Sequence, residues 1–112
     1  MREASSQLKR IESSVQVALA SIIQFEFKGT SLGFVTITGV KISPDLSFAA
    51  IHVVSHDQVD HKSILQTLNQ AAKSLRYKLA QKIKMRKMPK LRFYYDESID
   101  RGARICQLLE ES

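Results

Sequence analysis

The spacing of apolar residues along this chain changes from helical to strand-like and back, and that order limits the folds it can form. Between residues 5 and 27, apolar residues recur every three or four positions, which is the spacing of one helix face. Two runs rich in β-branched residues follow, and Ser43-Pro44-Asp45 between them favours a tight turn and an antiparallel hairpin. The predicted elements are a helix at 5–27, strands at 34–42 and 46–54, helices at about 61–73 and 75–87, and a third strand in which Leu91, Phe93 and Tyr95 alternate with Lys90, Arg92 and Tyr94. This order, α-β-β-α-α-β, predicts an α+β domain with helices packed on a three-stranded sheet.

The second helical stretch is too long for one ordinary helix. Its apolar positions run from Ile64 to Ile83, whereas the mean helix of a globular protein has about 11–12 residues. A serine inside a helix competes for backbone hydrogen bonds, so we predict a break at Ser74. Pro89 ends the pattern, because the residue before a proline disfavours the helical conformation.

The same stretch carries an uneven charge. No Asp or Glu occurs between Asp60 and Asp96, whereas ten of the 17 Lys and Arg residues do. An ordinary surface mixes both signs, and this chain of 112 residues has a net charge of +6. A segregated positive field favours a polyphosphate partner, so the sequence predicts a nucleic-acid-binding domain.

The basic residues border an apolar stripe if residues 75–87 form one helix. Leu75, Leu79 and Ile83 would share a face, with cations on both flanks. A solvated helix face with cations near its C-terminus is the simpler interpretation, but it does not explain the lack of acids. Among the aromatic residues, Tyr94 is the best candidate for stacking on a base. The candidate phosphate-binding residues are Lys73, Arg76, Lys78, Lys82, Lys84, Arg86, Lys87, Lys90 and Arg92.

Short motifs follow one another in a fixed order along nearly the whole chain. They are Val35-Thr36-Ile37-Thr38 leading to Ser43-Pro44-Asp45-Leu46, Leu75-Arg76 after Ala72-Lys73-Ser74, Pro89-Lys90-Leu91-Arg92-Phe93 with Asp96, and Gly102-Ala103-Arg104-Ile105. Together they resemble the ribosome-binding factor A family of bacterial small-subunit assembly factors. The resemblance implies a single-domain type-II KH-like fold. We expect that domain to span residues 1–96, followed by a tail over 97–112 that forms a short helix.

The resemblance also implies a way of binding RNA that differs from other KH domains. KH domains usually clamp RNA with a GXXG loop, but Gly occurs here only at 29, 33, 39 and 102. The family has an Ala-x-Gly kink between the central helices, and Ala72-Lys73-Ser74 takes that place here. The implied function is binding to the immature 30S subunit and its 16S rRNA precursor, with help in late maturation, including in the cold. No catalytic activity and no cofactor are implied.

Other functions have weaker support. A DNA-reading helix-turn-helix that uses residues 75–87 is the main alternative. The segment His56-Asp57-Gln58-Val59-Asp60-His61 could ligate a metal ion, but Asp57 or Asp60 is better explained as a helix N-cap, so we predict no metal site. The single cysteine, Cys106, has no catalytic motif around it. No apolar run approaches the length of a membrane span, and we expect a cytoplasmic monomer.

Overall fold

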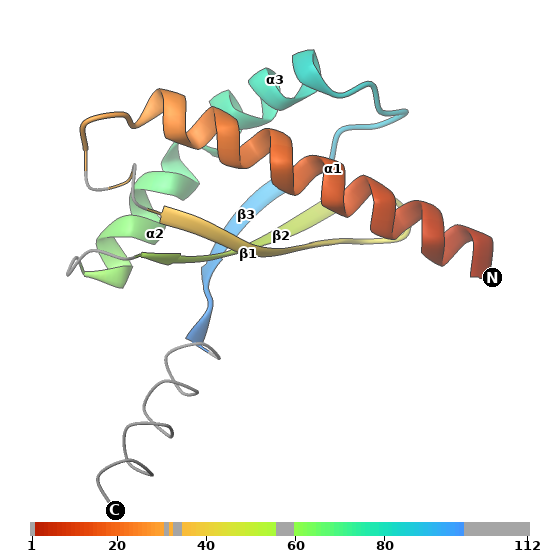
Figure 1. Cartoon of the computed structure of the whole chain (residues 1–112), viewed down its shortest axis with the longest axis horizontal. Coiled ribbons are helices and arrows are strands. Elements are labelled where there is room, and N and C mark those ends of the chain that lie inside the picture. The colour runs from red at the N-terminus through yellow and green to blue at the C-terminus, as the bar shows by residue number, and fades with distance from the viewer. Residues whose placement is uncertain (1, 31, 33–34, 56–59, 98–112) are drawn as a thin grey trace, which may run out of the picture.

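The part of the chain that the structure describes contains three helices and three strands in the predicted order, α-β-β-α-α-β (Figure 1). This computed structural model describes residues 2–30, 32, 35–55 and 60–97, without the side chains of residues 2–6. The predicted tail therefore lies outside the described residues, apart from Glu97. The helices are α1 (Arg2–Glu26), α2 (His61–Gln70) and α3 (Ala72–Lys82), and the strands are β1 (Val35–Ile42), β2 (Phe48–Ser55) and β3 (Lys90–Tyr95).

The sheet has the order β1-β2-β3, with the helices gathered on one of its faces (Figure 1). Strands β1 and β2 form the predicted antiparallel hairpin, whereas β3 runs parallel to β2. A parallel neighbour requires a crossover connection, and α2 and α3 supply it. This α+β arrangement agrees with the type-II KH-like fold that the resemblance implied.

The core lies between the helices and one face of the sheet. Alternate residues of each strand point into it, so Leu91 and Phe93 of β3 are buried beside Ala49 and Ile51 of β2. Burial of each Leu, Ile or Phe side chain contributes about 1.5–3 kcal/mol. The predicted apolar stripes of the helices face the core, except that Ile83 lies beyond the end of α3. Their fully buried members are Val15 and Leu19 of α1, Leu68 of α2, and Leu75 and Leu79 of α3.

Helix side chains occupy the two free edges of the sheet. On β1, the amide of Ile42 donates to Glu12 Oε2 at 2.8 Å, and Gln16 Nε2 donates to the Ile37 carbonyl at 3.0 Å. On β3, Asn69 pairs with Phe93 as a neighbouring strand would. Its Oδ1 accepts from the Phe93 amide at 2.9 Å, and its Nδ2 donates to the Phe93 carbonyl at 3.3 Å. These contacts satisfy edge groups that a strand partner would otherwise bind.

A further side-chain hydrogen bond connects β1 to the residue that follows β3. The register of β1 and β2 shifts between Ile37 and Gly39, which leaves Thr38 at a bulge. The Thr38 hydroxyl donates to Asp96 Oδ2 at 2.6 Å, and the Asp96 amide donates to the Val53 carbonyl at 2.8 Å. Asp96, the acid that follows the acid-free stretch, is therefore hydrogen-bonded to both β1 and β2.

The break between α2 and α3 lies at Ala71, which corrects its predicted position at Ala72-Lys73-Ser74. Ala71 has φ −87° and ψ 0°, and it serves as the C-cap of α2 and the N-cap of α3. Lys73 and Ser74 lie inside α3, where both are exposed. Because this bridge conformation has a negative φ, the break does not require a glycine.

Helix α3 ends at Lys82, five residues before the predicted end at residue 87. Ile83 has the extended conformation, with φ −122° and ψ 128°. Ile83, Met85 and Met88 are all partly buried against the core. Side chains two residues apart, such as Ile83 and Met85, point to the same side of an extended chain. This segment therefore packs against the core as extended chain and not as helix. Lys84, Arg86 and Lys87 are consequently on a connection and not on helix flanks.

Candidate nucleic-acid interface

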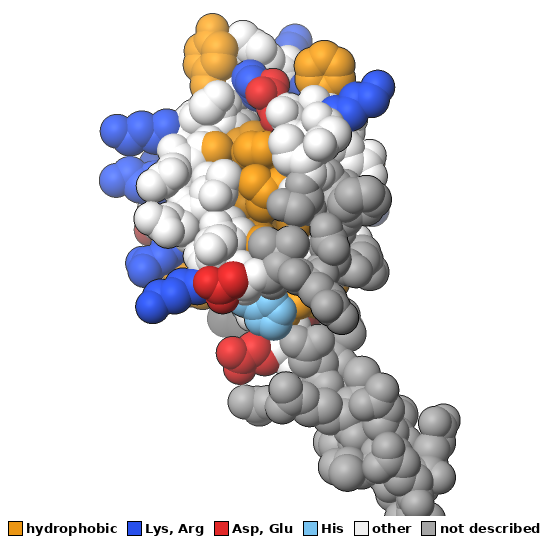
Figure 2. Space-filling model, turned by 90° about the vertical axis from the view of Figure 1, so that its left-hand side faces the viewer, with side chains coloured by type: hydrophobic (Ala, Val, Ile, Leu, Met, Phe, Trp, Pro, Cys, Tyr) orange, Lys and Arg blue, Asp and Glu red, His pale blue; other side chains and the backbone are white. Residues whose placement is uncertain are grey.

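The nine predicted phosphate-binding residues lie on three parts of the fold. Figure 2 shows Lys and Arg side chains along the left edge of its view. Seven of the nine are exposed, and Arg76 and Lys78 are half-buried. The sequence therefore predicted their exposure well but not their grouping. Lys73, Arg76, Lys78 and Lys82 are on α3, Lys84, Arg86 and Lys87 are on the connection at 83–89, and Lys90 and Arg92 are on β3.

Arg76 has a structural role. Its Nε and Nη2 atoms donate to the Met88 carbonyl at 3.2 and 2.7 Å. This fork of hydrogen bonds attaches the connection at 83–89 to α3. A guanidinium has five N–H donors, so three remain for another ligand.

Lys78 forms an ion pair with Glu26 at the end of α1. Both side chains are about one-third exposed, so the pair contributes at most about 1 kcal/mol. The pair matters more for charge, because Glu26 neutralises a cation that the sequence placed in the binding set. The fold thus brings an acid from residue 26 next to Lys78, in the middle of the acid-free stretch.

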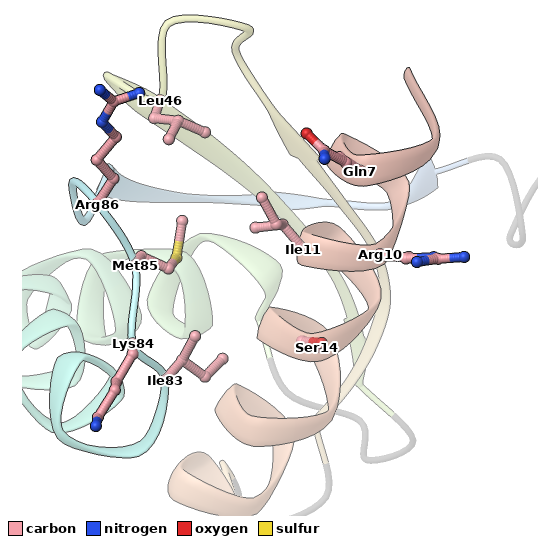
Figure 3. Close-up of a pocket in the computed structure, with 9 residues that line it drawn as sticks. All are labelled: Gln7, Arg10, Ile11, Ser14, Leu46, Ile83, Lys84, Met85 and Arg86. Atoms are coloured by element: carbon pink, nitrogen blue, oxygen red, sulfur yellow. The ribbon is translucent and has the colours of Figure 1, made fainter. Parts of the chain in front are cut away.

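Lys84 and Arg86 stand at the rim of a cleft between α1 and the connection at 83–89. The cleft has a volume of about 440 Å³. In Figure 3 its apolar side chains point into the space between α1 and the connection, Lys84 points away from them, and the Arg86 side chain extends toward Leu46. Arg10 of α1 also lines this cleft and points away from it (Figure 3). The apolar side chains are Ile11, Leu46, Ile83 and Met85.

Arg10 was missing from the predicted set because it lies some 70 residues earlier than Lys84. No feature of the sequence around Arg10 indicates that α1 packs beside the connection at 83–89. Only the packing of α1 against α3 brings these cations together.

Lys87 lies near the turn between β1 and β2. In that turn, Asp45 accepts hydrogen bonds from the Ser47 and Ser43 hydroxyls, both at 2.7 Å, as the predicted turn chemistry requires. These bonds, together with the Ser47 amide and the positive charge of Lys87, lower the pKa of Asp45 to about 2. Asp45 therefore remains charged, so it offsets part of the positive field of Lys87.

Lys90 and Arg92 extend from the face of the sheet opposite the core. The strand register places Lys41, Ala50 and Arg92 in one row across this face. Sequence reasoning missed Lys41, because only the pairing of strands reveals the row. Tyr94, the predicted stacking residue, is already engaged. Its ring stacks with His52 at 5.8 Å between centroids, and the Arg92 guanidinium lies 5.7 Å from its centre.

The alternative metal cluster falls mostly outside the described residues, since 56–59 are among those not described. Asp60 is the N-cap of α2, as expected, and accepts a hydrogen bond from the Lys62 amide. The His61 ring stacks on Tyr95 at 3.5 Å between centroids. Within residues 2–30, 32, 35–55 and 60–97, His, Cys, Asp and Glu form no group of three or more that could hold a metal ion. None of the helices in these ranges is long and apolar enough to cross a membrane.

Comparison with known proteins identifies the family. A sequence model of ribosome-binding factor A matches residues 7–109. The chain belongs to the ribosome-binding factor A family. It is 40% identical to ribosome-binding factor A of Pseudomonas paraeruginosa over 115 residues, which covers 100% of this chain and 90% of that protein. It is also 40% identical to the Marinomonas protein over 111 residues, covering 96% and 86% of the two chains.

Solved structures of the family share this fold. The crystal structure of ribosome-binding factor A from Thermus thermophilus superposes with a TM-score of 0.72 at 27% identity, covering 79% of this chain and 94% of that one. The solution structure of a Thermotoga maritima family member gives 0.65 at 26% identity, with coverage of 77% and 83%. A Thermus thermophilus homology model, fitted into a cryo-EM map of a 30S complex with the factor, gives 0.68 at 27% identity, with coverage of 79% and 93%.

Proposed function

We propose that this protein binds the immature 30S ribosomal subunit through its 16S rRNA and assists late maturation, including at low temperature. It acts without catalysis and without a cofactor, as a cytoplasmic monomer. Membership of the family and the 30S complex of its Thermus relative support the choice of partner. The observation that carries the proposal is the acid-free stretch from 61 to 95, whose cations are mostly exposed.

The helix side of the molecule offers the main phosphate-binding surface. Its exposed cations are Lys73, Lys82, Lys84, Arg86 and Lys87, with Arg10 added from α1. Phosphate contacts release counterions, so affinity must fall steeply with salt. Five such contacts would give a slope of about −3.5 to −4.5 in log K against log salt.

A helix-turn-helix regulator of DNA has less structural basis. That alternative needed residues 75–87 as a recognition helix with its cations on one element. Helix α3 ends at Lys82, and its buried residues Leu75 and Leu79 face the sheet. Lys84, Arg86 and Lys87 then belong to an extended connection, which does not present a helix to a major groove.

The experiment is co-sedimentation with immature small subunits over a salt series. The variant Lys73→Glu/Lys84→Glu should remain folded by circular dichroism and lose most binding. The control Lys9→Glu/Lys28→Glu makes the same charge change, from +6 to +2, at exposed positions on and just after α1. We expect the control to bind nearly as well as the wild type.

Two outcomes would contradict the proposal. Wild-type protein that does not bind subunits at low salt would exclude the function. Equal loss in both variants would show that net charge matters and that this surface does not. Arg92→Glu tests the open face of the sheet separately.

A further inference from the structure

Tyr77 is a solvent-exposed aromatic residue on the outer face of α3. Its side chain is 67% exposed, whereas Leu75 and Leu79 of the same helix are buried against the sheet. One exposed aromatic residue is common on protein surfaces and needs no explanation by itself. The surroundings of Tyr77 distinguish it.

Tyr77 lies in an open depression of about 460 Å³. Lys73 precedes it by one helical turn, and Ala80 follows it by three residues on the same face. The small Ala80 side chain leaves space beside the ring. The depression is lined by Lys73, Arg76, Tyr77, Ala80 and Met88.

Arg76 gives the depression a cation held in place before any ligand arrives. Two of its N–H groups bind the Met88 carbonyl, and its other three are available. A guanidinium that is already ordered loses less side-chain entropy when it binds a phosphate. An aromatic ring and a fixed cation therefore adjoin one another on this surface.

The other candidate aromatic residues lack this combination. Tyr94 is half-buried, with His52 and Arg92 against its ring. Phe25 is 80% exposed, but it is not among the residues that line the depression beside Arg76. Tyr77 is thus the described aromatic residue that combines high exposure with cations on the same surface.

We propose that the depression around Tyr77 binds one unpaired nucleotide of RNA. The base stacks on the Tyr77 ring, and its phosphate contacts Lys73 and the free N–H groups of Arg76. Every base has a flat π-face, so such a site accepts single-stranded RNA with little sequence preference. The positive charge around the ring favours RNA over an apolar protein segment. This inference rests on the proposed function, because rRNA supplies the strand.

The test uses the full-length chain with matched substitutions. The chain contains no Trp, so Tyr77→Trp introduces a single indole whose fluorescence reports stacking. That variant is titrated with a short single-stranded oligoadenylate. Tyr77→Ala, Tyr77→Phe and Phe25→Ala are compared with the wild type by co-sedimentation with immature small subunits.

We expect oligoadenylate to quench the indole and Tyr77→Ala to bind subunits about 5- to 100-fold more weakly than the wild type. Tyr77→Phe and Phe25→Ala should bind as the wild type does, since stacking needs the ring and not the hydroxyl. The salt slope should be unchanged in Tyr77→Ala but smaller by about 0.7–0.9 in Lys73→Ala, because a charged side chain releases counterions when it binds a phosphate and an uncharged ring does not.

Wild-type affinity in Tyr77→Ala would refute the stacking site, while the charge-reversal pair would still decide the proposed function. A Tyr77→Phe variant that binds as weakly as Tyr77→Ala would also refute stacking and would indicate a contact through the hydroxyl. If oligoadenylate does not quench the indole although Tyr77→Ala has lost subunit binding, stacking is again refuted, and Tyr77 contacts a protein partner. If wild-type protein fails to bind subunits, the proposed function fails. Quenching by oligoadenylate then still shows that the depression binds single-stranded RNA.

Discussion

Removal of the Arg76 guanidinium should destabilise the fold as well as weaken RNA binding. In Arg76→Ala the Met88 carbonyl loses both of its donors. A hydrogen bond to a charged group contributes about 1.5–3 kcal/mol. Both bonds here share one carbonyl that is only partly buried, so we expect a loss of about 1.5–2.5 kcal/mol in the free energy of unfolding. For a chain of this size, that corresponds to a Tm lower by roughly 6–12 °C.

Urea denaturation followed by circular dichroism measures this loss, and Lys73→Ala is the control. Lys73 is exposed on the same helix, so its replacement should change stability by no more than about 0.5 kcal/mol. Arg76→Lys keeps the charge but cannot form the fork, and it should fall between the two. If Arg76→Ala is as stable as Lys73→Ala, the hydrogen bonds from Arg76 to Met88 do not stabilise the attachment of the connection to α3.

Three further substitutions test other contacts. Asn69→Ala leaves the amide and carbonyl of Phe93 without their partner, and should cost about 1.5–3 kcal/mol in urea unfolding. Thr38→Val removes the hydroxyl that donates to Asp96, and the same assay should show a loss of about 1–2 kcal/mol. The pKa of Asp45 is lowered from 3.8 to about 2, so its carboxylate stabilises the fold above pH 3.8 and that contribution is lost as the pH falls toward 2. The Tm of Asp45→Asn should therefore lie below that of the wild type at pH 6, and the gap should be much smaller at pH 2. An equal gap at both pH values would contradict this.

The order of elements could be predicted from the sequence because each element has its own apolar period. The end of α3 could not, because Ile83 continues the four-residue spacing of Leu75 and Leu79. Its side chain does reach the core, but from an extended backbone. The same ambiguity placed Lys84, Arg86 and Lys87 on a helix. The spacing of apolar residues indicates which side chains are buried. The backbone conformation that buries them also depends on the position of the next element in the fold.

The position of the helix break shows a second limit. Ser74 offered a local reason for a break, yet the chain turns at Ala71, which is a good helix former. Tertiary contacts place α2 and α3 separately against β3, and Asn69 is held at Phe93 two residues before the turn. Local preference is worth less than these contacts, so the break occurs where packing requires it.

The individual roles of the cations were also not available from the sequence. Arg76 and Lys78 look alike there as members of one basic run. In the fold, Arg76 binds Met88 and Lys78 binds Glu26, while Lys73 remains exposed. Each distinction depends on a partner at least 12 positions away in the chain, which charge counting does not reveal.

The side chains at the free edges of the sheet also determine how this protein can meet other chains. A strand added to β1 would have to displace Glu12 from Ile42 and Gln16 from Ile37, and one added to β3 would have to displace Asn69 from Phe93. Edge strands without such partners are sites of domain swapping, amyloid growth and peptide capture by strand addition. The sheet is thus protected against self-association through its backbone, which leaves side-chain surfaces such as the cations and Tyr77 for recognition.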